Sequence, residues 1–183
     1  MTTLAETFRN AFARNAGVAH GPLDPAGAVD LACDRILDLA HGEAVAVAAG
    51  ELPVGDLSVR EALTARGIAL VSPDHPEWRD VIAGCAVGVT DSLAAVAGTG
   101  TFAVGCGPGA PRAISLVPDA HVGFLAASSI DATFEEAFAR ATAAGLAPNL
   151  VWISGPSRSA DIEKKITLGV HGPRTVEVVI VDA

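Results

Sequence analysis

The sequence predicts an α/β domain in which a mixed sheet is flanked by helices. Short apolar runs of strand length alternate with longer segments whose apolar residues recur at helical spacing. In the middle of the chain, the connections 107–111 and 118–120 are too short for crossover helices, which neighbouring parallel strands require. We therefore expect the centre of the chain to be antiparallel or to change sheets.

Helix starts are marked by capping boxes, in which a hydroxyl residue is followed three positions later by a glutamate. Thr3 with Glu6, Ser58 with Glu61 and Thr133 with Glu136 form such pairs. Leu4, Phe8, Ala11 and Phe12 then make an apolar stripe on the first helix. Helices are expected at 3–16, 26–40, from 58 onward, and at 75–83, 91–97, 133–144 and 159–166.

Strands are expected where apolar runs are compact and bounded by turn residues. These runs lie at 43–49, 68–71, 85–89, 101–106, 113–117, 121–126, 150–153 and 176–181. The stretch 17–25 contains two glycines and two prolines and is expected to be a linker after the first helix. We thus expect one domain over 1–183, with 1–25 forming an N-terminal helix and linker.

Composition excludes several classes of protein. Apolar residues make up 50% of the chain and charged residues 18%, so intrinsic disorder is excluded. The net charge of −9 offers no basic face for nucleic acid and would be repelled by an anionic membrane surface. There is no secretory signal pattern and no apolar run of membrane-spanning length. A cytoplasmic location is expected, with no nucleic-acid or membrane partner.

The cysteines and histidines predict neither a resident metal nor another cofactor. Cys33, Cys85 and Cys106 are scattered and form no CxxC pair, which argues against zinc ribbons, iron–sulfur clusters and a disulfide-stapled fold. The five histidines include no HExxH motif. His121 opens an apolar strand and is expected to be a half-buried packing residue.

The stretch 98–103 matches the GxGxxA pattern of a dinucleotide-binding loop. That function needs a strand before the glycines and a helix after them, whereas the residues after Gly100 are strand-like. We therefore expect a tight turn between a helix and a strand. The backbone amides of this turn and the hydroxyls of Thr99 and Thr101 could face a ligand, and a purely structural turn is the alternative.

The stretch from Ser154 to Asp161 reads Ser-Gly-Pro-Ser-Arg-Ser-Ala-Asp. A strand that enters a Gly-Pro turn and then a helix capped by Ser157 or Ser159 would present free N–H groups to an anion, with Arg158 beside them. The alternative is that the serines only cap the helix and Arg158 pairs with an acidic neighbour. His171 begins a His-Gly-Pro-Arg loop that suits ligand contact.

These two regions together resemble the LUD-domain family of lactate-utilisation protein C (LutC). The resemblance lies in Gly88-Val-Thr90, in Ala97-Gly-Thr-Gly-Thr101, in 154–163 and in 168–174. Between them, Ser115-Leu-Val-Pro118 and His121 resemble the family's Ser-Leu-hydrophobic-Pro…His segment. The family has glutamate where this chain has Gly98, so a carboxylate that could act as base, nucleophile or metal ligand is missing. The chain would then bind without catalysing, or use another acid such as Asp91.

The resemblance implies a fold like that of the sugar-phosphate isomerase and CoA-transferase superfamily (NagB/RpiA/CoA-transferase-like). It also implies a role as a cluster-free subunit in the oxidation of L-lactate to pyruvate, together with iron–sulfur subunits. A stand-alone isomerase, acyl-transfer or cyclo-ligase-type enzyme that acts on a phosphorylated or carboxylated small molecule is the alternative.

One pocket for a small carboxylate or phosphate is expected at the edge of the sheet. The residues of this pocket come from the two motif regions. Each can donate a hydrogen bond to the anion through a hydroxyl, a guanidinium, an imidazole or a backbone amide. They are Thr99, Gly100 and Thr101 on one wall, and Ser154, Ser157, Arg158, His171 and Arg174 on the other.

Overall fold

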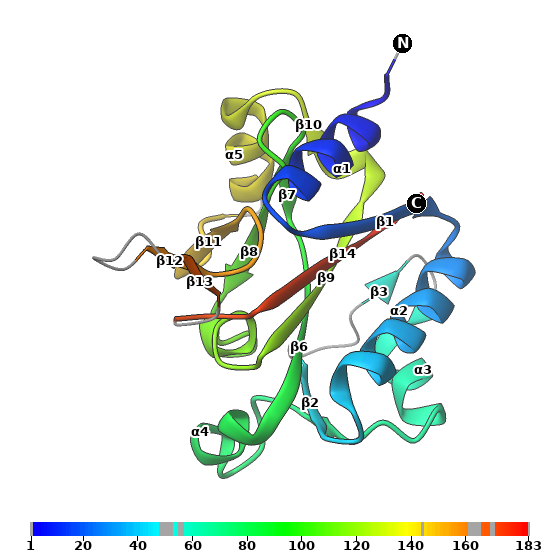
Figure 1. Ribbon diagram of the computed structural model, residues 1–183, viewed down its shortest axis with the longest axis vertical. Helices are drawn as coiled ribbons and strands as arrows, with labels where there is room; N and C mark the ends of the chain where they lie inside the picture. Colours follow the sequence, from blue (N-terminus) through cyan, green and yellow to red (C-terminus); the bar gives the residue numbers. More distant parts are fainter. Residues whose placement is uncertain are drawn as a thin grey trace.

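The computed structural model describes residues 2–47, 53–54, 57–143, 145–160, 166–168 and 171–182. A large parallel sheet runs through the centre of the molecule, and its strand order is β1-β14-β9-β6-β2-β5 (Figure 1). Its strands are β1 (Val18–Leu23), β2 (Ala44–Val47), β5 (Leu70–Val71), β6 (Cys85–Asp91), β9 (Ala120–Ala126) and β14 (Thr175–Val181). The mixed α/β class predicted from the sequence is confirmed.

A second, four-stranded sheet has the order β10-β7-β8-β11. It consists of β7 (Ala94–Val96), β8 (Thr101–Cys106), β10 (Ile130–Asp131) and β11 (Asn149–Ile153), and β8 is antiparallel to both β7 and β11. The chain leaves the large sheet after β6 and returns to it at β9. The change of sheet expected from the short central connections is therefore present. Two small hairpins are β3 (Pro53–Val54) with β4 (Leu57–Ser58), and β12 (Arg158–Ala160) with β13 (Ile166–Leu168).

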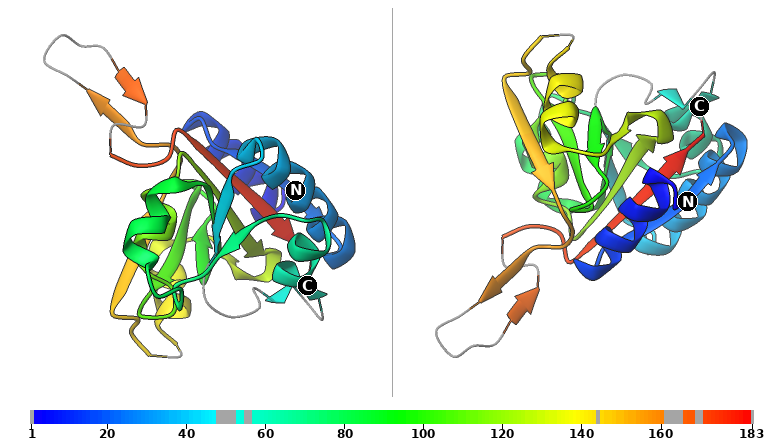
Figure 2. Two further views of the ribbon diagram at one scale, coloured as in Figure 1. Left: turned by 90° about the horizontal axis from the view of Figure 1, so that it is seen from below. Right: turned by 90° about the horizontal axis from the view of Figure 1, so that it is seen from above.

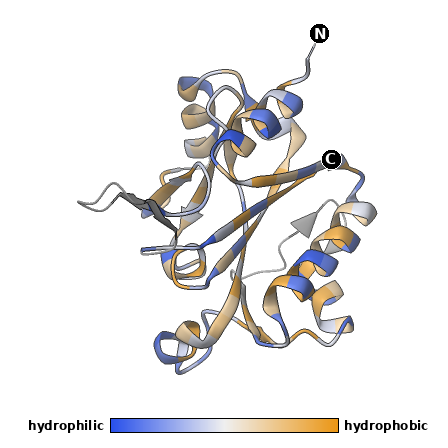
Figure 3. Cartoon of the chain, in the orientation of Figure 1, coloured by the Kyte–Doolittle hydropathy of each residue, from blue (hydrophilic) through white to orange (hydrophobic). Residues whose placement is uncertain are grey.

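Helices cover both sheets. The α-helices are α1 (Leu4–Arg14), α2 (Pro25–Ala40), α3 (Val59–Ala65), α4 (Trp78–Val81) and α5 (Phe134–Thr142), and the 3-10 helices are η1 (Ile82–Gly84), η2 (Arg112–Ser115) and η3 (Ala127–Ser129). Two of the predicted capping boxes are formed by hydrogen bonds in both directions, at Thr3 with Glu6 and at Thr133 with Glu136. Blue and orange residues alternate along α1 and α2 in Figure 3, as expected for helices with one buried face.

The elements are arranged in layers. Apolar residues of α2 and α3, such as Ile36 and Leu63, pack with those of the large sheet on one face. On the opposite face, Phe8 and Phe12 of α1 pack with β14 and with Phe102 of the second sheet. Ala137 and Ala141 of α5 cover the far side of the second sheet. The many alanines allow these layers to approach closely.

Before residue 118, three elements differ in type from the prediction. The segment 91–97, predicted to be a helix, contains β7, because pairing with β8 overrides the helical preference of its alanines. The segment 113–117, predicted to be a strand, is replaced by η2, which begins after Pro111. The predicted linker 17–25 contains β1, whose Gly-Pro pair is tolerated at the edge of a sheet.

Candidate functional site

The Thr-Gly-Thr turn connects β7 to β8. It was expected to join a helix to a strand, and it instead closes a hairpin because 94–96 is extended. The amide of Gly100 donates to the carbonyl oxygen of Val96 over 3.1 Å. Gly100 has a φ of +61°, a conformation that favours glycine.

Helix α1 packs directly on this turn. A Cβ atom at Gly100 would overlap the backbone of Ala11 and Phe12, so a glycine is needed for the close approach. Just beyond the helix, Asn15 Nδ2 donates to the carbonyl oxygen of Thr99 over 3.1 Å. The C-terminal end of α1 is therefore part of the region that the sequence assigned to the site.

Ser154 and Thr101, which were expected on opposite walls of one pocket, are in direct contact. Their hydroxyl oxygens lie 2.8 Å apart, and either can donate. The antiparallel register explains this contact, because Ile153 of β11 pairs with Phe102 of β8 and the next residue along β11 falls beside Thr101. The two motif regions, about fifty residues apart in the sequence, thus meet at one end of the second sheet.

A hollow of about 280 Å³ lies at this meeting point. It is lined by Asn15, Ser154, Gly155, Pro156 and Arg158. Gly155 sits close to the loop after α1, because a Cβ atom there would lie 2.6 Å from the carbonyl oxygen of Asn15. A hydroxyl, an amide and a guanidinium therefore border a space suited to a small polar molecule.

In the part of 159–166 that the structure describes, the prediction of a helix is wrong. Arg158–Ala160 form β12, which pairs antiparallel with Ile166–Leu168 of β13. The β-branched residues Ile166 and Thr167 favour this extended pairing. Figure 2 shows the hairpin projecting from the body of the molecule. Within the residues described here, Ser157 and Ser159 therefore cap no helix, and no helix start stands beside Arg158 to bind an anion. Asp161 lies outside the described residues.

The Ser157 and His171–Arg174 loops face each other, but the predicted residues do not line one pocket. Ser154 and Arg158 line the hollow, and the linings of the two cavities include none of Thr99, Gly100, Thr101, Ser157 and His171. The Ser157 amide donates to the carbonyl oxygen of Pro173 over 3.0 Å. His171 is exposed. Arg174 lines a different cavity of about 630 Å³ at the amino ends of β6, β9 and β14. Its Nε lies 4.0 Å from Asp119 Oδ1 there.

His121 is completely buried, whereas the sequence predicted a half-buried position. Its Nε2 lies 2.9 Å from Thr90 Oγ1, and its ring stacks on Phe102 with centroids 5.9 Å apart. Burial lowers the pKa of His121 to about 4, so the ring is neutral at neutral pH. His121 thus joins the large sheet to the second sheet.

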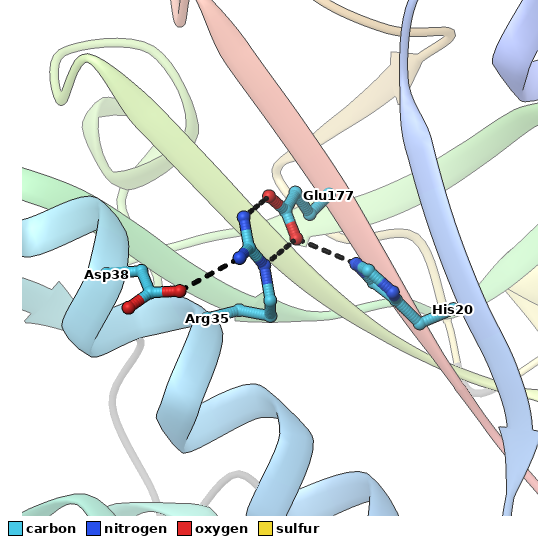
Figure 4. Close-up of polar contacts among 4 residues, drawn as sticks. All are labelled: His20, Arg35, Asp38 and Glu177. Atoms are coloured by element: carbon cyan, nitrogen blue, oxygen red, sulfur yellow. Dashed lines mark hydrogen bonds and ion pairs between the residues drawn. The ribbon is translucent and has the colours of Figure 1, made fainter.

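Sequence reasoning missed a charged cluster on the α2 face of the large sheet (Figure 4). Glu177 of β14 is held by Arg35, through Nη2 to Oε1 at 2.8 Å and Nε to Oε2 at 3.0 Å, and by His20 Nε2 to Oε2 at 2.8 Å. Arg35 also bonds Asp38. The sequence did contain a sign of this cluster, because a glutamate lies within the apolar run of β14. A charge buried in such a run needs a partner of opposite charge.

The pKa of Glu177 reflects two opposing effects. Burial alone would raise it, but the hydrogen bonds from His20 and Arg35 lower it to about 2. The carboxylate therefore stays charged over the whole neutral and mildly acidic range. Both partners come from β1 and α2, so the cluster fixes these elements against β14. We assign it a structural role.

The described residues contain no group of three or more histidine, cysteine or acidic side chains that could hold a metal ion. All three cysteines are free and buried, and burial raises the pKa of each thiol. Thiols of this kind are poor nucleophiles. None of the helices in the described ranges has the length and apolar character needed to cross a membrane.

The fold matches that of a solved structure. A DUF162 family protein from Deinococcus radiodurans superposes with a TM-score of 0.67 over 97% of this chain and 96% of that one, at 19% sequence identity. This defines the chain as an α/β protein of that architecture. The LUD domain family model matches residues 12–181, so the chain belongs to the LUD domain family.

Curated relatives carry the name lactate utilization protein C. Those from Shouchella clausii and an Exiguobacterium species are 35% and 39% identical over 100 residues, which is 52% of this chain and 44% of theirs. The relative from Deinococcus radiodurans is 36% identical over 104 residues, 55% of this chain and 45% of its own. The chain thus spans less than half of the length of these relatives.

Proposed function

We propose that this protein is a LutC-like component of a system that oxidises L-lactate to pyruvate. It binds a small carboxylate in the hollow beside Ser154 and Arg158, and it does not itself carry electrons. The observation that carries the proposal is the meeting of the two motif regions, marked by the contact of 2.8 Å between the Thr101 and Ser154 hydroxyls. Membership of the LUD domain family supports it.

The chemistry of the hollow suits a hydroxy acid. A guanidinium offers paired donors with the spacing of carboxylate oxygens, and Arg158 borders the hollow. The hydroxyl of Ser154 can exchange hydrogen bonds with the α-hydroxyl of lactate or the keto oxygen of pyruvate. A volume of about 280 Å³ is just below the range typical of sites for larger, drug-sized molecules.

The lining of the hollow favours binding over catalysis. Its five lining residues include no carboxylate, imidazole or thiol, whereas removing a proton or hydride equivalent from lactate needs a base and an electron acceptor. The position where relatives carry a glutamate is Gly98. A stand-alone isomerase or transferase has no acid–base pair in this lining, which makes it the weaker candidate.

The electrons from lactate must then pass to another subunit. The sequence has no CxxC pair that would hold a cluster. We infer that iron–sulfur subunits are the partners, as the resemblance implies. Deleting the gene should abolish growth on L-lactate as sole carbon source and leave growth on pyruvate intact. Unchanged growth on L-lactate would refute the proposal.

Changing Arg158 to alanine should weaken binding of L-lactate or pyruvate about tenfold, because the anion loses a charge-assisted contact worth about 1.5 kcal/mol. The measurement is isothermal titration of the purified protein with each acid. Arg174→Ala is the matched control, since Arg174 is also an exposed arginine but lines the other cavity. Equal loss of affinity in both variants, or none in Arg158→Ala, contradicts the assignment of this hollow.

Restoring the family's carboxylate with Gly98→Glu should leave the fold intact. Gly98 is exposed, and a Cβ atom there would meet no atom within 4 Å. We expect the free energy of unfolding to change by no more than about 0.5 kcal/mol, as for an ordinary surface substitution. Urea denaturation followed by circular dichroism measures it. A loss well beyond this value would show that the turn has no room for the family's side chain.

A further inference from the structure

Asn15 brings a side-chain amide to the hollow beside Ser154. It follows α1 directly and lines the hollow together with Ser154, Gly155, Pro156 and Arg158. Both views in Figure 2 place the end of α1 beside the base of the β12–β13 hairpin. Of the five lining residues, Asn15 is the one that lies outside the two motif regions of the sequence. The amide therefore reaches the hollow from a separate element of the fold.

The backbone holds Asn15 in position. Its N–H donates to the carbonyl oxygen of Phe12 over 3.0 Å, and this bond ends α1. Phe12 is completely buried, so the end of the helix is anchored in the core. On the other side, a Cβ atom at Gly155 would lie 3.3 Å from the Cβ atom of Asn15. Asn15 is thus fixed between α1 and the loop that follows Ser154.

One hydrogen bond sets the orientation of the Asn15 amide. Nδ2 lies 3.1 Å from the carbonyl oxygen of Thr99. A carbonyl oxygen can only accept, so the nitrogen of the amide and not its oxygen must face Thr99. Oδ1 is the other polar end of the amide, and no residue in the described part of the chain donates to it. Oδ1 therefore remains open to a ligand.

The polar side chains of the hollow differ in what they offer a ligand. The guanidinium of Arg158 can only donate. The hydroxyl of Ser154 can donate or accept, and it already shares a hydrogen bond with Thr101. Oδ1 of Asn15 is the one side-chain atom of the lining that can only accept. A matching ligand thus has an anionic end for Arg158 and a second group that donates to Asn15.

We propose that Asn15 makes the hollow selective for a 2-hydroxy acid over the corresponding 2-keto acid. This inference rests on the proposed binding of a small carboxylate beside Arg158. The hydroxyl of L-lactate donates to Oδ1 of Asn15 while its carboxylate stays on the guanidinium. The keto oxygen of pyruvate can only accept, so it leaves Oδ1 without a donor. The hollow therefore retains the substrate of the oxidation more tightly than its product.

Isothermal titration of the wild-type protein with three acids tests this selectivity. L-lactate, propionate and pyruvate share a three-carbon chain, and their second carbon carries a hydroxyl, only hydrogens or a keto oxygen. We expect L-lactate to bind about fivefold more tightly than propionate, as for one added hydrogen bond. Pyruvate should bind no more tightly than propionate. Pyruvate that binds as tightly as L-lactate overturns the inference.

Two substitutions distinguish a ligand contact from a purely structural role of Asn15. Asn15→Ala should lower the affinity for L-lactate to that for propionate and leave the affinity for propionate unchanged. Asn15→Asp keeps an acceptor, so the preference for L-lactate should remain while the added negative charge weakens binding of all three acids. A purely structural Asn15 would instead weaken the three acids equally in both variants, and that result overturns the inference.

Asn10→Ala is the matched control for these variants. Asn10 is an exposed asparagine of α1 that borders a different hollow. This change should leave the affinities for L-lactate, propionate and pyruvate as they are in the wild type. If it removes the preference for L-lactate as Asn15→Ala does, the preference does not come from Oδ1 of Asn15 and the inference is wrong.

Arg158→Ala separates a failure of this selectivity from a failure of the proposed function. If the wild type binds L-lactate and pyruvate equally and Arg158→Ala weakens both, a carboxylate binds beside Arg158 and only the role of Asn15 is wrong. If none of the three acids binds to the wild-type protein, the proposed function and the selectivity are both wrong.

Discussion

Changing Arg35 to alanine is expected to lower the free energy of unfolding by about 3 kcal/mol, among the largest single-residue effects in the molecule. The Glu177 side chain is only 3% exposed and receives two hydrogen bonds from Arg35. Without them, a charged carboxylate remains buried with His20 as its partner. The value is at the lower end for a broken buried pair, because Arg35 is itself one-third exposed.

Asp38→Ala is the control for this variant. Asp38 also bonds Arg35, at 3.0 Å, but its side chain is 69% exposed. Exposed pairs contribute about 0–1 kcal/mol. Urea denaturation at neutral pH compares the two variants with the wild type. If Arg35→Ala and Asp38→Ala lower the free energy of unfolding equally, burial of Glu177 does not explain the destabilisation.

The pH dependence provides a separate check on the same cluster. The pKa of Glu177 is lowered from 4.5 to about 2 in the folded protein. Between these values the unfolded chain binds a proton that the folded protein does not, so acidification destabilises the fold. The contribution, about 3 kcal/mol, is complete above pH 4.5 and is lost as the pH falls to 2. Arg35→Ala should reduce this loss of stability between pH 4.5 and pH 2. If the loss is unchanged in the variant, Arg35 is not what lowers the pKa of Glu177.

Changing Gly100 to alanine should be comparably damaging. The new Cβ atom would overlap the backbone of Ala11 and Phe12, and the φ of +61° would be strained for any residue with a side chain. Overpacking and strain together predict a loss of about 2–4 kcal/mol. Because α1 would be displaced from the turn, the hydrogen bond from Asn15 to Thr99 should also weaken.

Gly98→Ala is the matched control in the same turn. Gly98 does not have a positive φ, and nothing lies within 4 Å of the position of its Cβ atom. Alanine there should leave the free energy of unfolding unchanged or raise it by about 0.5 kcal/mol. Denaturation of the two variants side by side measures the difference. Equal stability of Gly98→Ala and Gly100→Ala would show that α1 does not rest on this turn.

Local signals in the sequence predicted local structure well. The capping boxes at Thr3 and Thr133 each precede a helix that begins one residue later. Thr101 and Ser154 were expected on opposite walls of one pocket, and they lie in direct contact, which follows from the register of β8 with β11. These features depend on short-range spacing or on motifs that relatives share.

Features that depend on distant pairing could not be predicted. The stretch 94–96 is alanine-rich, and its pairing with β8 and β10 makes it a strand. The segment Arg158–Ala160, which was expected at the start of a helix, is extended because it pairs with β13. Arg174 follows the Gly-Pro turn that approaches Ser157, yet its side chain lines a different cavity from Arg158. Neither hydropathy nor turn chemistry reveals such pairings.

The pairing of β1 with β14 has a consequence for synthesis of the chain on the ribosome. Val18 pairs with Glu177, so β1 finds its neighbour in the sheet only after more than 150 further residues have been made. Until then, β1 and the phenylalanines of α1 lack their final contacts. This segment therefore depends on delayed folding or on a chaperone while translation continues.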